Sequence, residues 1–226
     1  MTVDSTSLSA WLGAHSRSLR RRIRLIMLLD TADYAMISPV STGRLHAFAY
    51  LADVLSPVYH LLPTSGRIYK RAIGPYFPDL QWELDRLIGM ALVNVSQLKT
   101  QVEKDEAFVD ACFALKRDRA AQILHLAYQD AELLRLRDFF RELAAALGAL
   151  PQAELDSTVL SDDTWEAAQP GTVIDYAEWR ARNRSAAGAE QIEEVAAEVW
   201  GGRAIQLSAA AKINLYVRYM RRSAHG

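Results

Sequence analysis

The segment from residue 74 to residue 115 constrains the fold most, because it places an amphipathic helix directly before two extended segments. The helix is predicted over residues 79–92, after a Gly-Pro turn. Its apolar side chains recur with a helical period: Leu80, Leu84, Leu87, Ile88 and Ala91. Extended segments are predicted over 92–98 and 107–115, and the polar residues 99–106 join them. This order predicts a helix followed by a two-stranded ribbon.

Two further helices are predicted before this segment, over residues 16–36 and 43–55. Ser41 and Thr42 are candidate N-caps of the second helix. The helix over 79–92 would pack across these two, and the ribbon would cover the remaining open side of their core. The sequence therefore predicts a winged helix-turn-helix-like domain over residues 1–117.

The rest of the chain, residues 118–226, predicts a long helix and a C-terminal helical region. The long helix is predicted over 118–147, which at 1.5 Å per residue is about 45 Å. Two shorter helices are predicted over 189–200 and 208–222, with Gly201-Gly202 between them. We therefore predict a mainly α fold with a small β ribbon, a winged-helix-like core and C-terminal helices.

The composition excludes several classes of protein. Hydrophobic residues make up 50% of the 226 residues and the net charge is -1, so the chain is neither disordered nor a polyelectrolyte. Cys112 is the only cysteine, which excludes an internal disulfide and a cysteine-based zinc site within one chain. No apolar run approaches the ~20 residues that span a bilayer, and the N-terminus lacks the pattern of a secretion signal. We expect a soluble, cytoplasmic protein that does not bind a membrane.

Residues that could carry catalysis form no recognisable constellation. The phosphate-loop and Gly-rich dinucleotide patterns are absent. The histidines are scattered, without the short spacings of metal ligands. Asp162 and Asp163 begin a carboxylate cluster in a turn-rich stretch, where an Asp pair commonly caps the next helix. We predict that the protein is not an enzyme and that it holds no cofactor and no metal.

The helix over 79–92 has the wrong charge for reading DNA. Asp79, Glu83 and Asp85 are predicted to be exposed, and only Arg86 offsets them. Phosphates would repel such a surface, whereas a basic protein surface would attract it.

Aromatic residues gather around the start of the same helix. They either staple the local core or anchor a protein partner, because large aromatic side chains are enriched at interfaces. The candidate partner-binding residues of this segment are Tyr76, Phe77, Asp79, Trp82 and Glu83.

Arginines form a dense run in the first predicted helix. The run comprises Arg20, Arg21, Arg22 and Arg24, with Arg17 one turn before. It is either the solvated face of that helix or a contact to the DNA backbone inside an assembled complex.

An apolar row on the long helix is a second candidate partner surface. It includes Leu136, Phe140 and Leu143. A helix that is apolar on two sides usually has two neighbours, so the row either meets a partner protein or lies inside the fold.

Two stretches carry a resemblance to a known family. The first stretch, residues 36–93, contains three segments: Gly43-Arg44-Leu45-His46-Ala47-Phe48-Ala49-Tyr50-Leu51, Gly74-Pro75-Tyr76-Phe77-Pro78-Asp79-Leu80 and Leu84-Asp85-Arg86-Leu87. The second stretch is Thr172-Val173-Ile174-Asp175-Tyr176, with Asn183 and Ser185 downstream. They resemble the middle component of bacterial ABC-type three-component conflict systems, and Lamassu-type antiphage systems have a small subunit of comparable kind. The likeness covers about half of the chain.

The resemblance implies a non-catalytic adaptor subunit in a bacterial antiphage defence complex. Such a subunit would join an SMC- or ABC-like ATPase to an effector, such as a nuclease, and DNA would be met through the complex. The family contributes no catalytic residue to carry over. The alternative is a winged-helix transcriptional regulator that binds DNA and dimerises through the helix over 118–147.

Overall fold

The computed structural model describes residues 5–63, 67–71, 74–103, 106–150, 154–169, 171–175, 183–199 and 206–225. Within these ranges the chain is mainly helical, with two small antiparallel sheets. The mainly α fold with a small amount of β structure is therefore confirmed.

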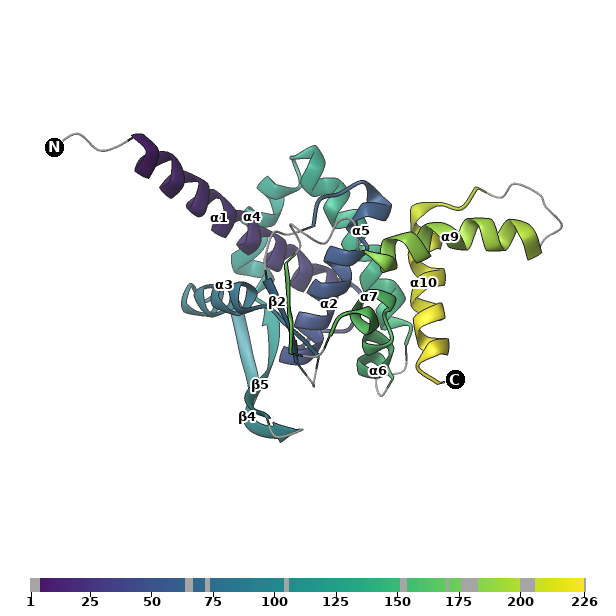
Figure 1. Ribbon diagram of the computed structural model, residues 1–226. Coiled ribbons are helices and arrows are strands. Elements are labelled where there is room, and N and C mark those ends of the chain that lie inside the picture. Colours follow the sequence, from purple (N-terminus) through teal and green to yellow (C-terminus); the bar gives the residue numbers. More distant parts are fainter. Residues whose placement is uncertain are drawn as a thin grey trace.

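The first two predicted helices are present. Helix α1 (Ser5–Tyr34) enters the centre of the molecule, and its N-terminal half projects outward (Figure 1). Strand β1 (Val40–Ser41) leads directly into helix α2 (Thr42–Val54). The Ser41 side chain accepts a hydrogen bond from the backbone N–H of Arg44, so the predicted N-cap is confirmed.

The predicted ribbon is a longer hairpin than the sequence suggested. Helix α3 (Pro78–Gly89) is followed by β4 (Val93–Glu103) and β5 (Glu106–Leu115), and β1 pairs antiparallel with β5. The strand order of this sheet is β1-β5-β4. The expectation that residues 99–106 form a connection was wrong for 99–103 and for 106, because the ladder continues to the pair Glu103↔Glu106.

A second sheet joins distant parts of the chain. Strands β2 (Arg67–Arg71) and β3 (Gly74–Tyr76) pair with each other, and β6 (Val173–Asp175) pairs with the other edge of β2. Gly74 begins β3 at a φ of 132°, a conformation that favours glycine. This sheet places the motif around residue 174 against residues 67–69, and Tyr176 of that motif lies outside the described residues.

The single long helix predicted over 118–147 was wrong. The structure has α4 (Arg117–Ala127) and α5 (Ala131–Gly148), separated by a short break. Asp130 is the N-cap of α5, where its side chain accepts from the N–H groups of Glu132 and Leu133 at 2.9 Å. An aspartate in a helical pattern offers the backbone an alternative to the helix, and here that alternative prevails.

The apolar row on α5 lies inside the fold. Leu136, Phe140 and Leu143 are 3%, 1% and 0% exposed. Phe140 meets Phe48 of α2 edge-on, with 6.2 Å between ring centroids. The prediction of a partner surface here was wrong, and the alternative of an internal row is what the structure shows.

The C-terminal part packs on the same core. It consists of α6 (Leu155–Leu160), α7 (Asp163–Ala167), α9 (Arg184–Val199) and α10 (Ala209–Ser223). Helices α9 and α10 contact the 3₁₀ helix η1 (Ser56–Tyr59), which directly follows α2. Helices α9 and α10 match the two that were predicted, whereas Gly201-Gly202 lies outside the described residues. One core of buried residues extends from Leu25 to Met220, across the boundary proposed at residue 117.

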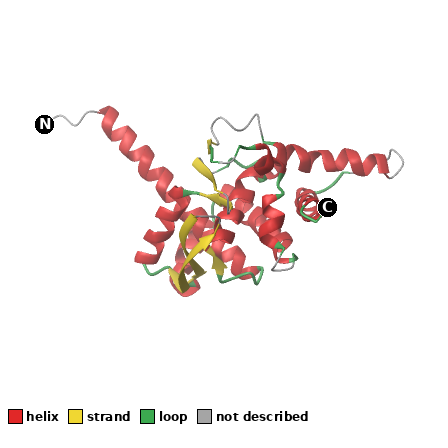
Figure 2. Cartoon of the chain, turned by 60° about the horizontal axis from the view of Figure 1, so that its bottom comes forward, coloured by secondary structure: helices red, strands yellow, loops and turns green. Residues whose placement is uncertain are grey.

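The hairpin and the C-terminal helices lie on opposite flanks of this core. Figure 1 shows α3 and the β4–β5 hairpin on one side and α9 and α10 on the other. Figure 2 shows the same separation from a second direction, with the strands on one side and the C-terminus on the other.

Candidate protein-interaction surface

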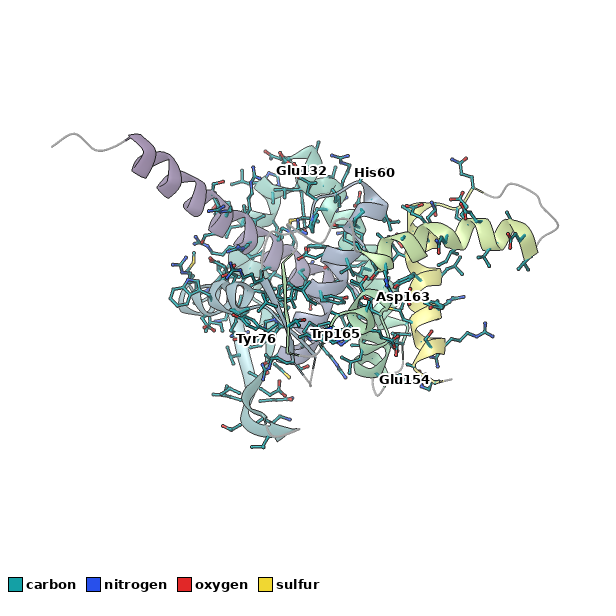
Figure 3. All side chains as sticks on the ribbon, viewed as in Figure 1. His60, Tyr76, Glu132, Glu154, Asp163 and Trp165 are labelled. Carbon is teal, nitrogen blue, oxygen red and sulfur yellow. The ribbon has the colours of Figure 1, made fainter. Side chains whose placement is uncertain are left out.

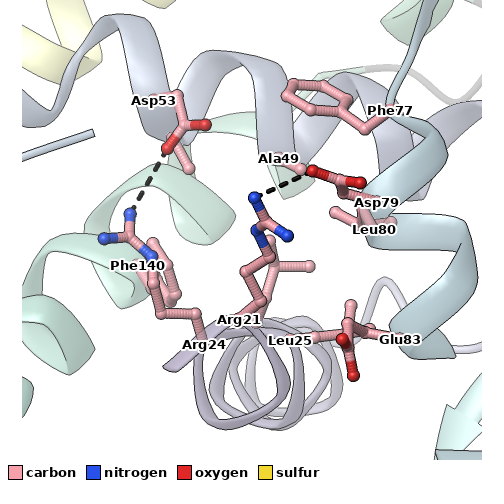
Figure 4. Close-up of a pocket in the computed structure, with 12 residues that line it drawn as sticks. Arg21, Arg24, Leu25, Ala49, Asp53, Phe77, Asp79, Leu80, Glu83 and Phe140 are labelled. Atoms are coloured by element: carbon pink, nitrogen blue, oxygen red, sulfur yellow. Dashed lines mark hydrogen bonds and ion pairs between the residues drawn. The ribbon is translucent and has the colours of Figure 1, made fainter. Parts of the chain in front are cut away.

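The predicted basic run on α1 and the predicted acidic residues of α3 face each other. Arg21 forms an ion pair with Asp79 at 2.8 Å (Figure 4), and Arg22 forms one with Glu83 at 2.9 Å. These two ion pairs join α1 and α3 across one helix–helix contact, which we call the α1–α3 junction.

Glu83 is buried at this junction, so its predicted exposure was wrong. Its side chain is only 3% exposed. It accepts a hydrogen bond from Ser18 Oγ at 2.6 Å and lies 3.5 Å from Arg86 Nη1. A buried carboxylate is tolerated only with such partners, because its desolvation is costly.

Arg24 also points into the protein rather than to solvent. Its guanidinium lies 3.4 Å from Asp53 of α2 (Figure 4) and donates to the carbonyl of Leu62 at 3.1 Å. Arg20 alone of the four predicted DNA-contacting arginines belongs to the exposed class. Most arginines of the run therefore form ion pairs within the fold.

A small cavity lies behind the Arg21 and Arg24 ion pairs. Its volume is about 50 Å³, with a floor of Leu25, Ala49 and Phe140 (Figure 4). Ligand pockets are typically ~300 Å³ or larger, so this space suits one or two waters and not a substrate.

Two of the three predicted aromatic anchors belong to the local core. Phe77 is buried, and its N–H donates to Nδ1 of His46 at 3.2 Å. Tyr76 is half-buried, 4.9 Å from the His46 ring and 5.0 Å from the Arg71 guanidinium. The stapling interpretation holds for these two residues.

Trp82 lies on the outward face of α3. It is 61% exposed, and the guanidinium of Arg86 lies 5.3 Å from its ring centroid. Asp85 is exposed beside it and accepts a hydrogen bond from Gln81 at 2.9 Å. Met90 follows at the end of the helix and is 54% exposed. We call Trp82, Asp85 and Met90 the α3 face.

The β4–β5 hairpin carries exposed apolar side chains away from the core. Leu98, Val102 and Val109 are 70%, 74% and 59% exposed. Strand β4 is an edge of its sheet, and its ladder is interrupted between Ser96 and Lys99. Exposed apolar residues on a projecting hairpin are typical of an interaction site. We call Leu98, Val102 and Val109 the hairpin arm.

Leu98 and Val109 were predicted in extended segments, but Val102 was missed, because the polar residues around it predicted a loop. The alternation of Leu98, Thr100 and Val102 is the period of a strand and was the available signal. Lys99 Nζ on β4 lies 3.7 Å from Asp110 Oδ2 on β5, so these two polar residues form an ion pair across the ladder.

Asp162 was predicted as a cap, and the structure confirms this role and adds a larger one. Its Oδ2 accepts from the N–H groups of Thr164 and Trp165 at the start of α7. It also accepts from the hydroxyls of Tyr50, Ser185 and Tyr216 at 2.6, 2.9 and 3.0 Å.

These contacts make Asp162 the joint between the N-terminal core and the C-terminal helices. Its donors come from α2, α7, α9 and α10, and it is completely buried. Burial raises the pKa of its carboxyl, and the surrounding donors oppose that rise. Figure 3 shows the neighbouring Trp165 and Asp163 between the central helices and α10. Asp162 is fully buried among these donors, so we assign it a structural role.

The residues that the structure describes include no group of three or more His, Cys, Asp or Glu that could hold a metal ion. None of the described helices has the length and apolarity needed to cross a membrane. Comparisons with known proteins find no matching family, no matching curated protein and no matching solved structure.

Proposed function

We propose that this protein is a non-catalytic adaptor subunit of a bacterial antiphage defence complex, in which it links an SMC- or ABC-like ATPase to an effector. The observation that carries the adaptor role is the α3 face. The helix that would read DNA in a winged-helix protein presents an exposed tryptophan beside Asp85 and Arg86 instead of a strip of basic residues.

The order of elements supports a winged-helix-like core. Helix α1, strand β1, helices α2 and α3 and the β4–β5 hairpin follow one another, and β1 pairs with β5. In that arrangement α3 takes the place of the recognition helix and the hairpin takes the place of the wing.

The charges of this core favour a protein partner over DNA. Three of the four arginines that could contact phosphates are paired within the fold, Arg21 and Arg22 at the α1–α3 junction and Arg24 at Asp53, whereas Arg20 is exposed. Trp82 and the hairpin arm supply large exposed apolar side chains, which are the usual anchors of protein interfaces. Asp85 beside Trp82 suits a basic rim on the partner.

The ATPase and the effector are proposed from the sequence resemblance alone. The motif around residue 174 adds one consistent feature, because β6 pairs with β2 just before the β3–α3 segment that carries the other half of the resemblance. The two halves of the likeness therefore belong to one structural unit.

Co-purification with the products of the neighbouring genes, among which the proposal expects an ATPase, tests the proposal. Trp82→Ala combined with Asp85→Lys is expected to abolish a stable complex, and Leu98→Asp combined with Val102→Asp tests the hairpin arm separately. Leu126→Ala is the matched control, because Leu126 is 59% exposed on α4, outside both surfaces. Glu83 is excluded from the test, because replacing it would disturb the α1–α3 junction.

A DNA-binding regulator is the second candidate, favoured by the order of elements. Under this alternative Asp85→Lys would leave or strengthen binding to a DNA duplex, and binding would fall steeply with salt. Fluorescence anisotropy across a salt series distinguishes the two candidates. Duplex binding by the chain alone, together with an intact ATPase complex after the Trp82 and Asp85 changes, would refute the adaptor proposal.

A further inference from the structure

An open groove of about 1590 Å³ lies between α9 and the C-terminal half of α10. On the α9 side it is lined by Ile192, Val195 and Val199, and the last two are 57% and 74% exposed. These residues are spaced i, i+3 and i+7, so they form one stripe along the helix. Figure 1 shows this outer part of α9 extending away from the body of the molecule.

The groove is held open by contacts at the base of α9. Ser185 and Ala189 are completely buried, which fixes the first turns of α9 on the core. Lys212 at the start of α10 pairs with Glu190 and, at 2.8 Å, with Glu193. The two helices are thus braced where they meet, and they diverge beyond that point.

The α10 wall of the groove carries two arginines that the described residues leave without an acidic partner. They are Arg218 and Arg222, both exposed and one helical turn apart. Arg221 differs, because its Nε pairs with Glu154 at 2.6 Å; Figure 3 shows Glu154 near the end of α10. An apolar groove with this basic wall fits an amphipathic helix with acidic residues along one edge.

Helix α9 is itself such a helix. Glu194 and Glu198 are exposed next to the apolar stripe, and no basic partner is found for them among the residues that the structure describes. Glu194 and Glu198 are four residues apart, as are Arg218 and Arg222. The Cβ atoms within each pair are therefore ~5–6 Å apart, so the two pairs can face each other.

We propose that the groove takes the α9 helix of a second copy of this chain, which makes the protein a symmetric homodimer. When α9 lies antiparallel to α10 of the second copy, Glu194 faces Arg222 of that copy and Glu198 faces Arg218 of that copy. The same contact repeats across the two-fold axis, so each copy covers the other's Val195 and Val199. This inference is independent of the proposed adaptor role, which uses the opposite flank.

Light scattering coupled to size exclusion, with sedimentation equilibrium, tests the proposal on the full chain. The wild type is expected to reach twice the 25.3 kDa of one chain, with weaker association at high salt. R218E/R222E and E194R/E198R are each expected to weaken association about tenfold or more, because like charges then face each other. Mixing the two variants should restore a dimer, since their charges are again complementary.

R119E/R135E is the matched control, because it makes the same change of charge at exposed positions outside the groove. It should associate like the wild type, and circular dichroism should show that every variant is folded. A chain that stays monomeric at every concentration overturns the proposal. So does a dimer that neither charge reversal weakens, or a mixture of the reversed variants that fails to associate. A monomer that binds an added acidic helical peptide through Arg218 and Arg222 would assign the groove to another protein.

Discussion

His46 connects α2 to the start of α3, and its charge state should govern the acid stability of the fold. Its Nδ1 accepts from the N–H of Phe77, and its Nε2 lies 3.4 Å from Gln81 Oε1, which suits a neutral ring with the proton on Nε2. Burial lowers the pKa of His46 from 6.5 to about 4, and the charge of Arg71 acts in the same direction. The folded protein therefore takes up this proton only at a much lower pH than the unfolded chain.

The pH dependence follows from this difference. Between pH 6.5 and about 4 the unfolded chain binds more protons at His46 than the folded protein does, so the free energy of unfolding rises with pH. The contribution is complete above pH 6.5 and is lost as the pH falls towards 4. The difference in pKa corresponds to about 3 kcal/mol.

Urea unfolding measured from neutral pH down to pH 4 checks the prediction. His46→Asn is the comparison, because the Asn Oδ1 can accept from Phe77 while the side chain does not titrate. The wild type should lose about 3 kcal/mol more than the variant across this window. Equal losses in the two proteins would show that His46 is not held neutral, and would refute the reasoning.

Four further changes test the remaining structural assignments. Phe140→Ala should cost about 3–5 kcal/mol in urea unfolding, because Phe140 lies in the core; a folded chain of unchanged stability would contradict this. Glu83→Ala should lower the free energy of unfolding by about 3 kcal/mol, since it leaves Arg22 without its partner at the α1–α3 junction. Trp82→Ala should change it by less than ~0.5 kcal/mol, because Trp82 is exposed. Asp162→Ala should cost about 4 kcal/mol, because it removes an N-cap and leaves the hydroxyls of Tyr50 and Tyr216 buried without their acceptor; a loss below ~1 kcal/mol would show that water replaces it.

Helices with strong local signals were predictable from the sequence. The Ser41 cap and the apolar period of α2 lie within a few residues of each other, so no distant contact was needed to place that helix. The break between α4 and α5 was also a local signal, but it was overlooked because Asp130 stands in a continuous apolar pattern. The interpretation followed the hydrophobic periodicity, which predicts one continuous helix. In the folded chain the Asp130 cap ends that continuity and begins a second helix.

Exposure on α3 depended on contacts that no local pattern shows. Glu83 and Asp85 are two residues apart and were assigned to one acidic face. The structure separates them, because α1 packs on one side of α3 and brings Arg22 against Glu83 only. The donors around Asp162 were hidden for the same reason, since Tyr50 and Tyr216 lie more than 50 residues from it in the chain.

The α1–α3 junction also bears on which kind of partner the protein can meet. A winged-helix protein that binds DNA keeps cations free on and around its recognition helix, because each phosphate contact contributes to affinity. Here Arg21 and Arg22 are committed to Asp79 and Glu83, and breaking those pairs to reach DNA would leave the Glu83 carboxylate buried without its partner. The cost of about 3 kcal/mol expected for that loss would have to be offset by any DNA contact that used Arg22. A protein partner that meets Trp82 and the hairpin arm needs no such rearrangement, so the proposed adaptor role does not carry this cost.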